Sequence, residues 1–156
     1  GEETAAGLAW LLVWTTLVWC VIWYAAVWVA ARLVHRLPPS SVDRENSVFF
    51  VGQKLSAWLK ALVVSALAMA GLLGLRGRSV EAFFDGYPVP EVAGVIFTAF
   101  EFADLALCSL HGLMTREYVL HHAIHITLGL LIRGNCFPAL HACVLMAQET
   151  SGLPLQ

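Results

Sequence analysis

Charge is scarce in this chain, and that scarcity excludes an ordinary soluble domain. Asp, Glu, Lys and Arg together make up 13% of the 156 residues, whereas a soluble protein carries about 25%. Hydrophobic residues make up 59%, and the net charge of −2 offers no basic excess. We therefore expect an integral membrane protein and no nucleic-acid partner.

Cysteine is also sparse, and its spacing excludes the common metal and redox motifs. The four cysteines are Cys20, Cys108, Cys136 and Cys143. None forms a CxxC pair, and most lie in apolar segments, where cysteine usually packs as a small hydrophobic residue. The cysteines therefore do not identify a metal site or a redox compartment.

The chain is rich in long apolar segments. Five of them follow one another, at about 7–31, 55–75, 90–111, 118–132 and from 137 to the polar residues at 148–151. A helix needs about 20 residues to cross the hydrocarbon core, and spanning backbone must satisfy its own hydrogen bonds. The predicted fold is all-α, a single transmembrane domain over 1–156 with about five transmembrane helices.

Five of the six tryptophans lie in the first apolar segment, at positions 10, 14, 19, 23 and 28. At about 100° per residue, Trp10, Trp14 and Trp28 share one face, and Trp19 and Trp23 share the opposite one. We interpret both groups as packing and lipid-contact residues.

Ionisable side chains nevertheless lie inside two of the apolar segments. The third carries a stripe at helical spacing, formed by Glu101, Asp104, Cys108 and His111. The fourth carries a comparable stripe, formed by Glu117, Tyr118, His121, His122, His125 and Gly129. Charged groups in hydrocarbon cost about 2.5 kcal/mol or more each, so they normally face a protein interior. The short loop at about 112–116 makes the two helices antiparallel neighbours, and both stripes are expected to point into one bundle interior.

Three chemistries could use this constellation. A histidine beside a carboxylate can serve acyl transfer, with Asp104 orienting the ring. His121 and His125, one turn apart, also match metal-ligand spacing, and histidines on different helices can hold haem. In the plainest alternative, the polar groups only hydrogen-bond across helices and hold the bundle together. We expect no metal and no haem, because membrane di-iron enzymes need further histidine boxes that this chain lacks.

Several motifs in this region occur in a recognisable order. They are Phe100-Glu101-x2-Asp104-Leu105, the pair His121-His122 about 17 residues later, and the closing Met146-Ala147-Gln148-Glu149-Thr150-Ser151. In these motifs the chain resembles the TLC family, which includes translocon-associated proteins, ceramide synthases and related lipid regulators. Lys54-Leu55-Ser56 through Lys60-Ala61 is similar to the family's early basic segment, although many members have His where Lys60 stands. The resemblance covers about 43–151.

The resemblance implies a helical bundle around a lipid-accessible cavity. In ceramide-synthase members the paired histidines, here His121 and His122, lie in the cavity and serve acyl transfer from acyl-CoA to a long-chain base. Other members are non-enzymatic regulators. The family domain continues for one or two helices after the closing motif, whereas this sequence stops at Gln156. Either the sequence is incomplete or the cavity is open on one side, and an open wall would undermine the dry site that acyl transfer needs.

We therefore expect a non-catalytic, TLC-like membrane protein that binds lipid, needs no cofactor, and serves as an accessory subunit among other membrane subunits. The residues assigned to its lipid cavity or interhelical polar network are Glu101, Asp104, His111, Tyr118, His121, His122, His125, His141, Gln148 and Glu149. A neighbouring chain or an ordered lipid should cover His141 and Gln148. The alternative is a ceramide-synthase-like N-acyltransferase with His121, His122 and Asp104 as catalytic residues. The resemblance suggests the endoplasmic reticulum, and an organellar inner or thylakoid membrane is the alternative location.

Overall fold

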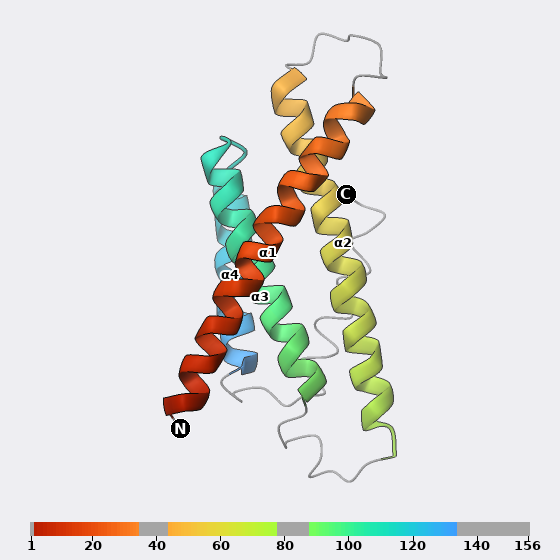
Figure 1. Cartoon of the computed structure of the whole chain (residues 1–156), viewed down its shortest axis with the longest axis vertical. Coiled ribbons are helices and arrows are strands. Elements are labelled where there is room, and N and C mark those ends of the chain that lie inside the picture. The colour runs from red at the N-terminus through yellow and green to blue at the C-terminus, as the bar shows by residue number, and fades with distance from the viewer. Residues whose placement is uncertain (1, 35–43, 78–87, 134–156) are drawn as a thin grey trace.

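The described part of the chain is a bundle of helices that alternate in direction (Figure 1). A computed structural model describes residues 2–34, 44–77 and 88–133, and these contain no strand. The four helices are α1 (Glu2–Val34), α2 (Arg44–Leu75), α3 (Pro88–Leu110) and α4 (Arg116–Arg133). The expected all-helical architecture is therefore present. The fifth predicted segment, from Phe137 onward, lies outside the described residues.

Three of these helices are long and apolar enough to cross a membrane, as expected of an integral membrane protein. The candidate spans are Ala9–Leu33 in α1, Val48–Gly74 in α2 and Val92–Leu110 in α3. α2 begins at Arg44, well before the predicted start near residue 55. The apolar pattern marks only the lipid-compatible part of a helix, whereas residues such as Gln53 and Lys54 are good helix formers and continue it.

α3 is the centre of the bundle. It packs against α1, α2 and α4, and α1 also packs against α2. Of the candidate spans, the one in α3 is 67% buried and the one in α1 only 11%. Small buried residues line the contacts, namely Ala57, Ala61, Ala68, Ala93, Ala99 and Ala103. Such residues let helix backbones approach closely, which is the main source of helix association in lipid.

Two glycines mark the closest approaches between helices. A Cβ atom placed on Gly52 of α2 would lie 2.7 Å from the Cα atom of Val27 on α1. A Cβ atom on Gly129 of α4 would overlap the Thr98 side chain on α3. A larger residue at Gly52 would collide with the backbone of α1, whereas one at Gly129 would require the Thr98 side chain to move.

The two tryptophan faces of α1 differ as predicted. Trp19 and Trp23 are 5% and 1% exposed, whereas Trp10, Trp14 and Trp28 are exposed by 60% or more. The inward face therefore helps to build the core, and the outward face remains available to lipid.

The connection between α3 and α4 explains why they are antiparallel. Gly112 has a φ of +69°, and its N–H donates to the carbonyl of Ser109 while Leu113 N–H donates to that of Cys108. This pair of bonds is a Schellman motif, which ends a helix on a left-handed residue. The Thr115 hydroxyl then accepts from Tyr118 N–H and caps the start of α4. The chain thus reverses within a few residues, as the short loop predicted.

Candidate functional site

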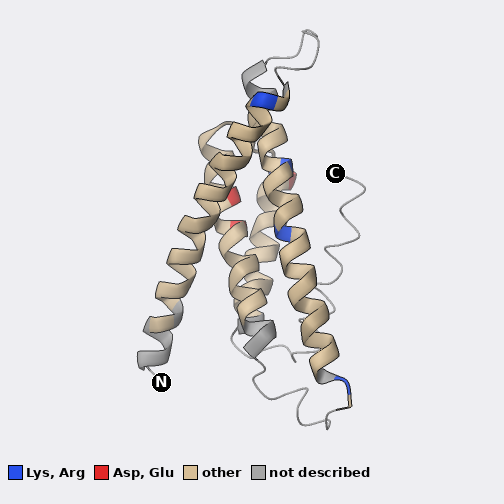
Figure 2. Ribbon diagram, turned by 45° about the vertical axis from the view of Figure 1, so that its right-hand side comes forward, with Lys and Arg blue, Asp and Glu red and all other residues tan. Residues whose placement is uncertain are grey.

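Two carboxylates lie in the middle of the bundle. Glu101 and Asp104 are each 1% exposed and are one helical turn apart on α3. Figure 2 shows that charged positions are few along the helices and that acidic ones lie within the bundle. Both carboxylates need partners, because an unpaired charge in this environment is very costly.

Asp104 connects the four described helices. One carboxylate oxygen accepts from the indole N–H of Trp23 on α1, at 3.2 Å, and lies 3.6 Å from the Cys108 thiol. The other oxygen accepts from the Gln53 amide on α2, at 3.2 Å, and from the Tyr118 hydroxyl on α4. The Gln53 amide also donates to the Tyr118 hydroxyl at 2.8 Å. With so many donors around it, Asp104 is held in one position.

Glu101 forms the second centre of the network. Lys60 on α2 places its ammonium 3.2 Å from Glu101 Oε1, and its side chain is only 7% exposed. The same ammonium lies 5.0 Å from the ring centroids of both Phe97 and Phe100. The Lys60 charge is thus stabilised by a carboxylate and two aromatic faces inside an apolar bundle.

His122 bridges the two carboxylates. Its Nδ1 atom lies 2.5 Å from Glu101 Oε2 and its Nε2 atom 3.3 Å from Asp104 Oδ2. The first contact is an ion pair without the alignment of a hydrogen bond. A carboxylate at each ring nitrogen favours the imidazolium form, with a proton on both. Among the described residues, Lys60 and His122 are the basic partners of the two acids.

The other two histidines of α4 differ from His122 in exposure. His125 is 19% exposed and places Nδ1 3.6 Å from Glu101 Oε1. His121 is exposed, and its ring centroid is 3.9 Å from that of His125. The sequence pair His121-His122 is therefore split between an exposed residue and a fully enclosed one.

His111 lies in a separate aromatic cluster near the end of α3. Its ring stacks on Phe49 and Trp23, with centroid distances of 4.1 Å and 5.3 Å. The Tyr24 hydroxyl is 3.3 Å from His111 Nε2. Trp23 is the link between this cluster and the polar network, because its indole N–H donates to Asp104.

Sequence reasoning missed the contribution of α2. Gln53, Ser56 and Lys60 are buried and are spaced by three and four residues, which places them on one face. The same spacing rule that found the α3 stripe would have found this one. His141, Gln148 and Glu149 lie outside the described residues. Within 2–34, 44–77 and 88–133, no group of three or more His, Cys, Asp or Glu side chains is placed to hold a metal ion.

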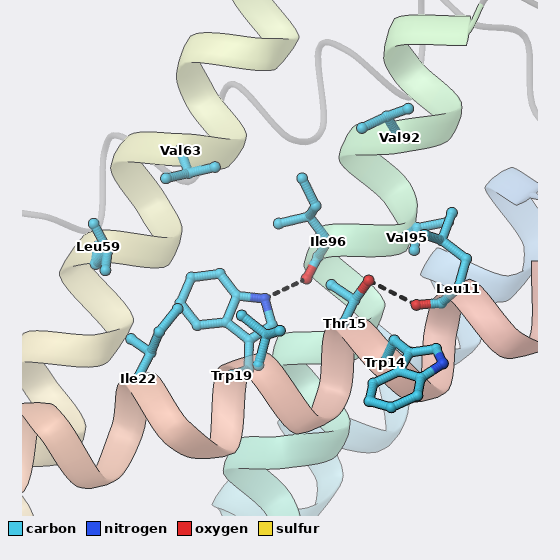
Figure 3. A pocket seen from close by; sticks show the side chains of 11 residues that line it. Leu11, Trp14, Thr15, Trp19, Ile22, Leu59, Val63, Val92, Val95 and Ile96 are labelled. Carbon is cyan, nitrogen blue, oxygen red and sulfur yellow. Dashed lines mark hydrogen bonds between the residues drawn. The ribbon is translucent and has the colours of Figure 1, made fainter.

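An apolar groove adjoins the network. It has a volume of about 460 Å³ and lies between α1, α2 and α3, which diverge toward the N-terminal end of α1 (Figures 1 and 3). Its lining consists of Leu11, Trp14, Thr15, Val18, Trp19, Ile22, Leu59, Val63, Val92, Val95 and Ile96. The Trp19 indole donates to the Ile96 carbonyl and the Thr15 hydroxyl to that of Leu11, as Figure 3 shows. Two polar side-chain groups of this lining, the Trp19 indole and the Thr15 hydroxyl, are therefore bonded within the protein.

Trp19 and Phe100 separate the groove from the network. Their rings meet edge to face, with centroids 5.2 Å apart, and pack with Ala57, Ala99 and Ala103. Along α3 the groove residues Val92, Val95 and Ile96 come before Phe100, and the two carboxylates follow it. The bundle therefore combines an apolar groove with a polar interior of paired ionisable side chains. No protein-family model matches the chain, and neither a curated protein nor a solved structure does.

Proposed function

We propose that this is a non-catalytic, TLC-like membrane protein that binds a membrane lipid, with an acyl chain in the groove between α1, α2 and α3. The groove is the observation that carries the proposal. Its volume falls in the range of about 300–1,000 Å³ that is usual for ligand sites. Its walls belong to the candidate membrane spans, so the molecules that meet it in a bilayer are lipid tails.

The length of the groove also suits an acyl chain. From Leu11 to Ile22 an α-helix rises about 16 Å. One leaflet contributes about half of a hydrocarbon core that is about 30 Å thick. One extended chain from one leaflet therefore matches the groove. Lipid tails are as apolar as the groove itself, so affinity comes from close packing.

The geometry of His122 supports a non-catalytic role. A general base needs a ring nitrogen that is free to take a proton from the substrate. Both nitrogens of His122 face carboxylates, and its side chain is 3% exposed. Asp104 in turn is held by donors from three helices. These contacts favour a network that fixes the helices against one another.

The accessory-subunit part of the proposal rests on α1. Its outward face carries Trp10, Trp14 and Trp28, and only 11% of its span is buried in the bundle. Such a face can pack against lipid or against a neighbouring membrane subunit. Purification in a mild detergent tests the difference, because a subunit elutes with stoichiometric partners.

By family resemblance the endoplasmic reticulum is the proposed membrane, and localisation of a tagged full-length protein tests it.

The lipid-binding proposal is tested with a photoreactive phosphatidylcholine. Purified protein in nanodiscs is irradiated, digested and analysed by mass spectrometry. Val63→Trp fills the groove, while Leu62→Trp adds the same bulk to a neighbouring position that is 58% exposed. We expect labelling of groove peptides to fall in the first variant and to persist in the second. Equal labelling in both variants, with intact folding, would contradict the proposal.

A second candidate function is acyl transfer, and one observation favours it. His121 is exposed, contacts the ring of His125, and is thereby connected to Glu101. An acyltransferase built on this site would use His121 as the accessible base. Labelled acyl-CoA and a long-chain amine test this activity. Turnover that disappears in His121→Ala would replace the non-catalytic proposal with the enzyme.

A further inference from the structure

We infer that Trp19 is the inner wall of the groove and fixes how deeply an acyl chain can enter. The inference rests on the proposed lipid binding and adds a residue that limits the bound chain. Trp19 lines the groove, yet it is only 5% exposed, so most of its ring is enclosed by protein. Figure 3 shows it between Ile22 and Ile96, on the opposite side of Ile96 from Val92.

The Trp19 ring is held firmly in this position. Its indole N–H donates to the Ile96 carbonyl at 3.2 Å. Its plane stands at 86° to that of Phe100, with ring centroids 5.2 Å apart. One contact fixes the polar edge of the indole and the other its apolar face. The indole ring therefore cannot easily move aside when the end of an acyl chain reaches it.

Three small side chains lie beside Phe100 in the cluster that contains Trp19. Ala57, Ala99 and Ala103 pack in the same cluster as Trp19, and they fill little volume themselves. Loss of the indole would leave a cavity there, because the surrounding helices relax only partly after a large-to-small substitution. That cavity would extend the groove toward the level of the carboxylates on α3.

The charged network explains why a wall is needed at this position. Glu101 follows Phe100 directly in α3, and Asp104 lies one turn further. Lipid methylenes in contact with these groups would separate them from their partners, and a buried charge without a partner is strongly destabilising. Trp19 thus keeps the acyl chain on the apolar side and the ion pairs on the other.

The depth limit follows from the position of Trp19 along α1. Between Leu11 and Trp19 the helix rises about 12 Å, slightly less than the thickness of one leaflet of hydrocarbon. An extended chain that enters beside Leu11 therefore ends near Trp19 and Ile22. A longer chain must bend out of the groove into the bilayer.

The test locates the chain terminus. The probe is a phosphatidylcholine whose decanoyl chain, matched to this depth, ends in a diazirine, incorporated into nanodiscs with the full protein. In the unaltered protein, the label should fall on peptides that contain Ile22, Leu59 or Ile96. In Trp19→Ala, the ratio of label on Ala103 and its neighbours to label on the groove should rise about tenfold, or about 1.4 kcal/mol.

Three further variants make the result specific. Trp10→Ala removes the same side chain from α1 at a position outside the groove lining, where Trp10 is 64% exposed, and should leave the terminus in place. Trp19→Phe retains a ring and should also label as the unaltered protein does. Trp19→Leu serves as the opened variant if Trp19→Ala does not give a monodisperse, helical protein. If the label position does not change in a folded variant that lacks the Trp19 ring, the role of Trp19 is overturned. If no groove peptide of the unaltered protein is labelled, lipid binding itself is overturned.

Discussion

Substitution of Asp104 by Asn gives the sharpest test of the polar network. The change retains the shape of the side chain but removes its charge, and it puts an amide NH2 group among donors. Trp23, Gln53 and Tyr118 all donate to the carboxylate, so at least one of these bonds must be lost. The substitution also leaves His122 with only one acidic partner.

The magnitude follows from burial and charge. Asp104→Asn removes one of the two acids and leaves both of their basic partners, Lys60 and His122, in the bundle. Removal of one partner from a buried ion pair costs about 3–5 kcal/mol. Interhelical hydrogen bonds in membranes are individually worth about 0.6 kcal/mol, so the charge imbalance dominates. We expect a loss of about 3 kcal/mol in the free energy of unfolding.

A double-mutant cycle separates charge balance from general damage. His122→Gln removes the opposite charge, so the double variant restores neutrality with Lys60 and Glu101 still paired. We expect the double variant to be more stable than the sum of the two single effects predicts, by about 1–3 kcal/mol. The assay is reversible unfolding in mixed micelles, with Thr15→Ala as control because its hydroxyl bonds only to its own helix. Additive effects would refute a network held together by this pair.

Further expectations concern backbone contacts and the buried lysine. Gly129→Ala should lower the free energy of unfolding by about 1–3 kcal/mol through overpacking. Gly7→Ala should not lower it, because a Cβ atom there meets no atom within 4 Å. Thermal unfolding measures both variants. Gly112→Ala should cost about 1 kcal/mol because of its positive φ, and Gly112→Asn less; the same assay checks the order. Lys60→Met should cost about 3 kcal/mol by leaving an acid unbalanced, while Lys54→Met, at a half-buried position, should cost less; equal losses would contradict the buried ion pair.

Patterns along the chain were sufficient for some features of the site and not for others. The spacing of Glu101 and Asp104 predicted that they share a face, because helical periodicity alone determines it. The same periodicity placed His121, His122 and His125 in one broad stripe. It did not reveal that His122 is the histidine enclosed between both carboxylates. A small rotation of α4 about its axis would place a neighbouring histidine there instead.

The sequence by itself determined that this is an all-helical chain with membrane-length segments, since hydropathy and helical periodicity are properties of consecutive residues. It also determined that Trp19 and Trp23 lie opposite the other three tryptophans of α1, while their burial shows which of the two faces is inward. Tertiary structure alone decided that Gln53 and Lys60 join the network and that α1, α2 and α3 form a groove lined by Trp19. These features depend on the rotation, crossing and depth of each helix, which arise from close packing between segments distant in the chain.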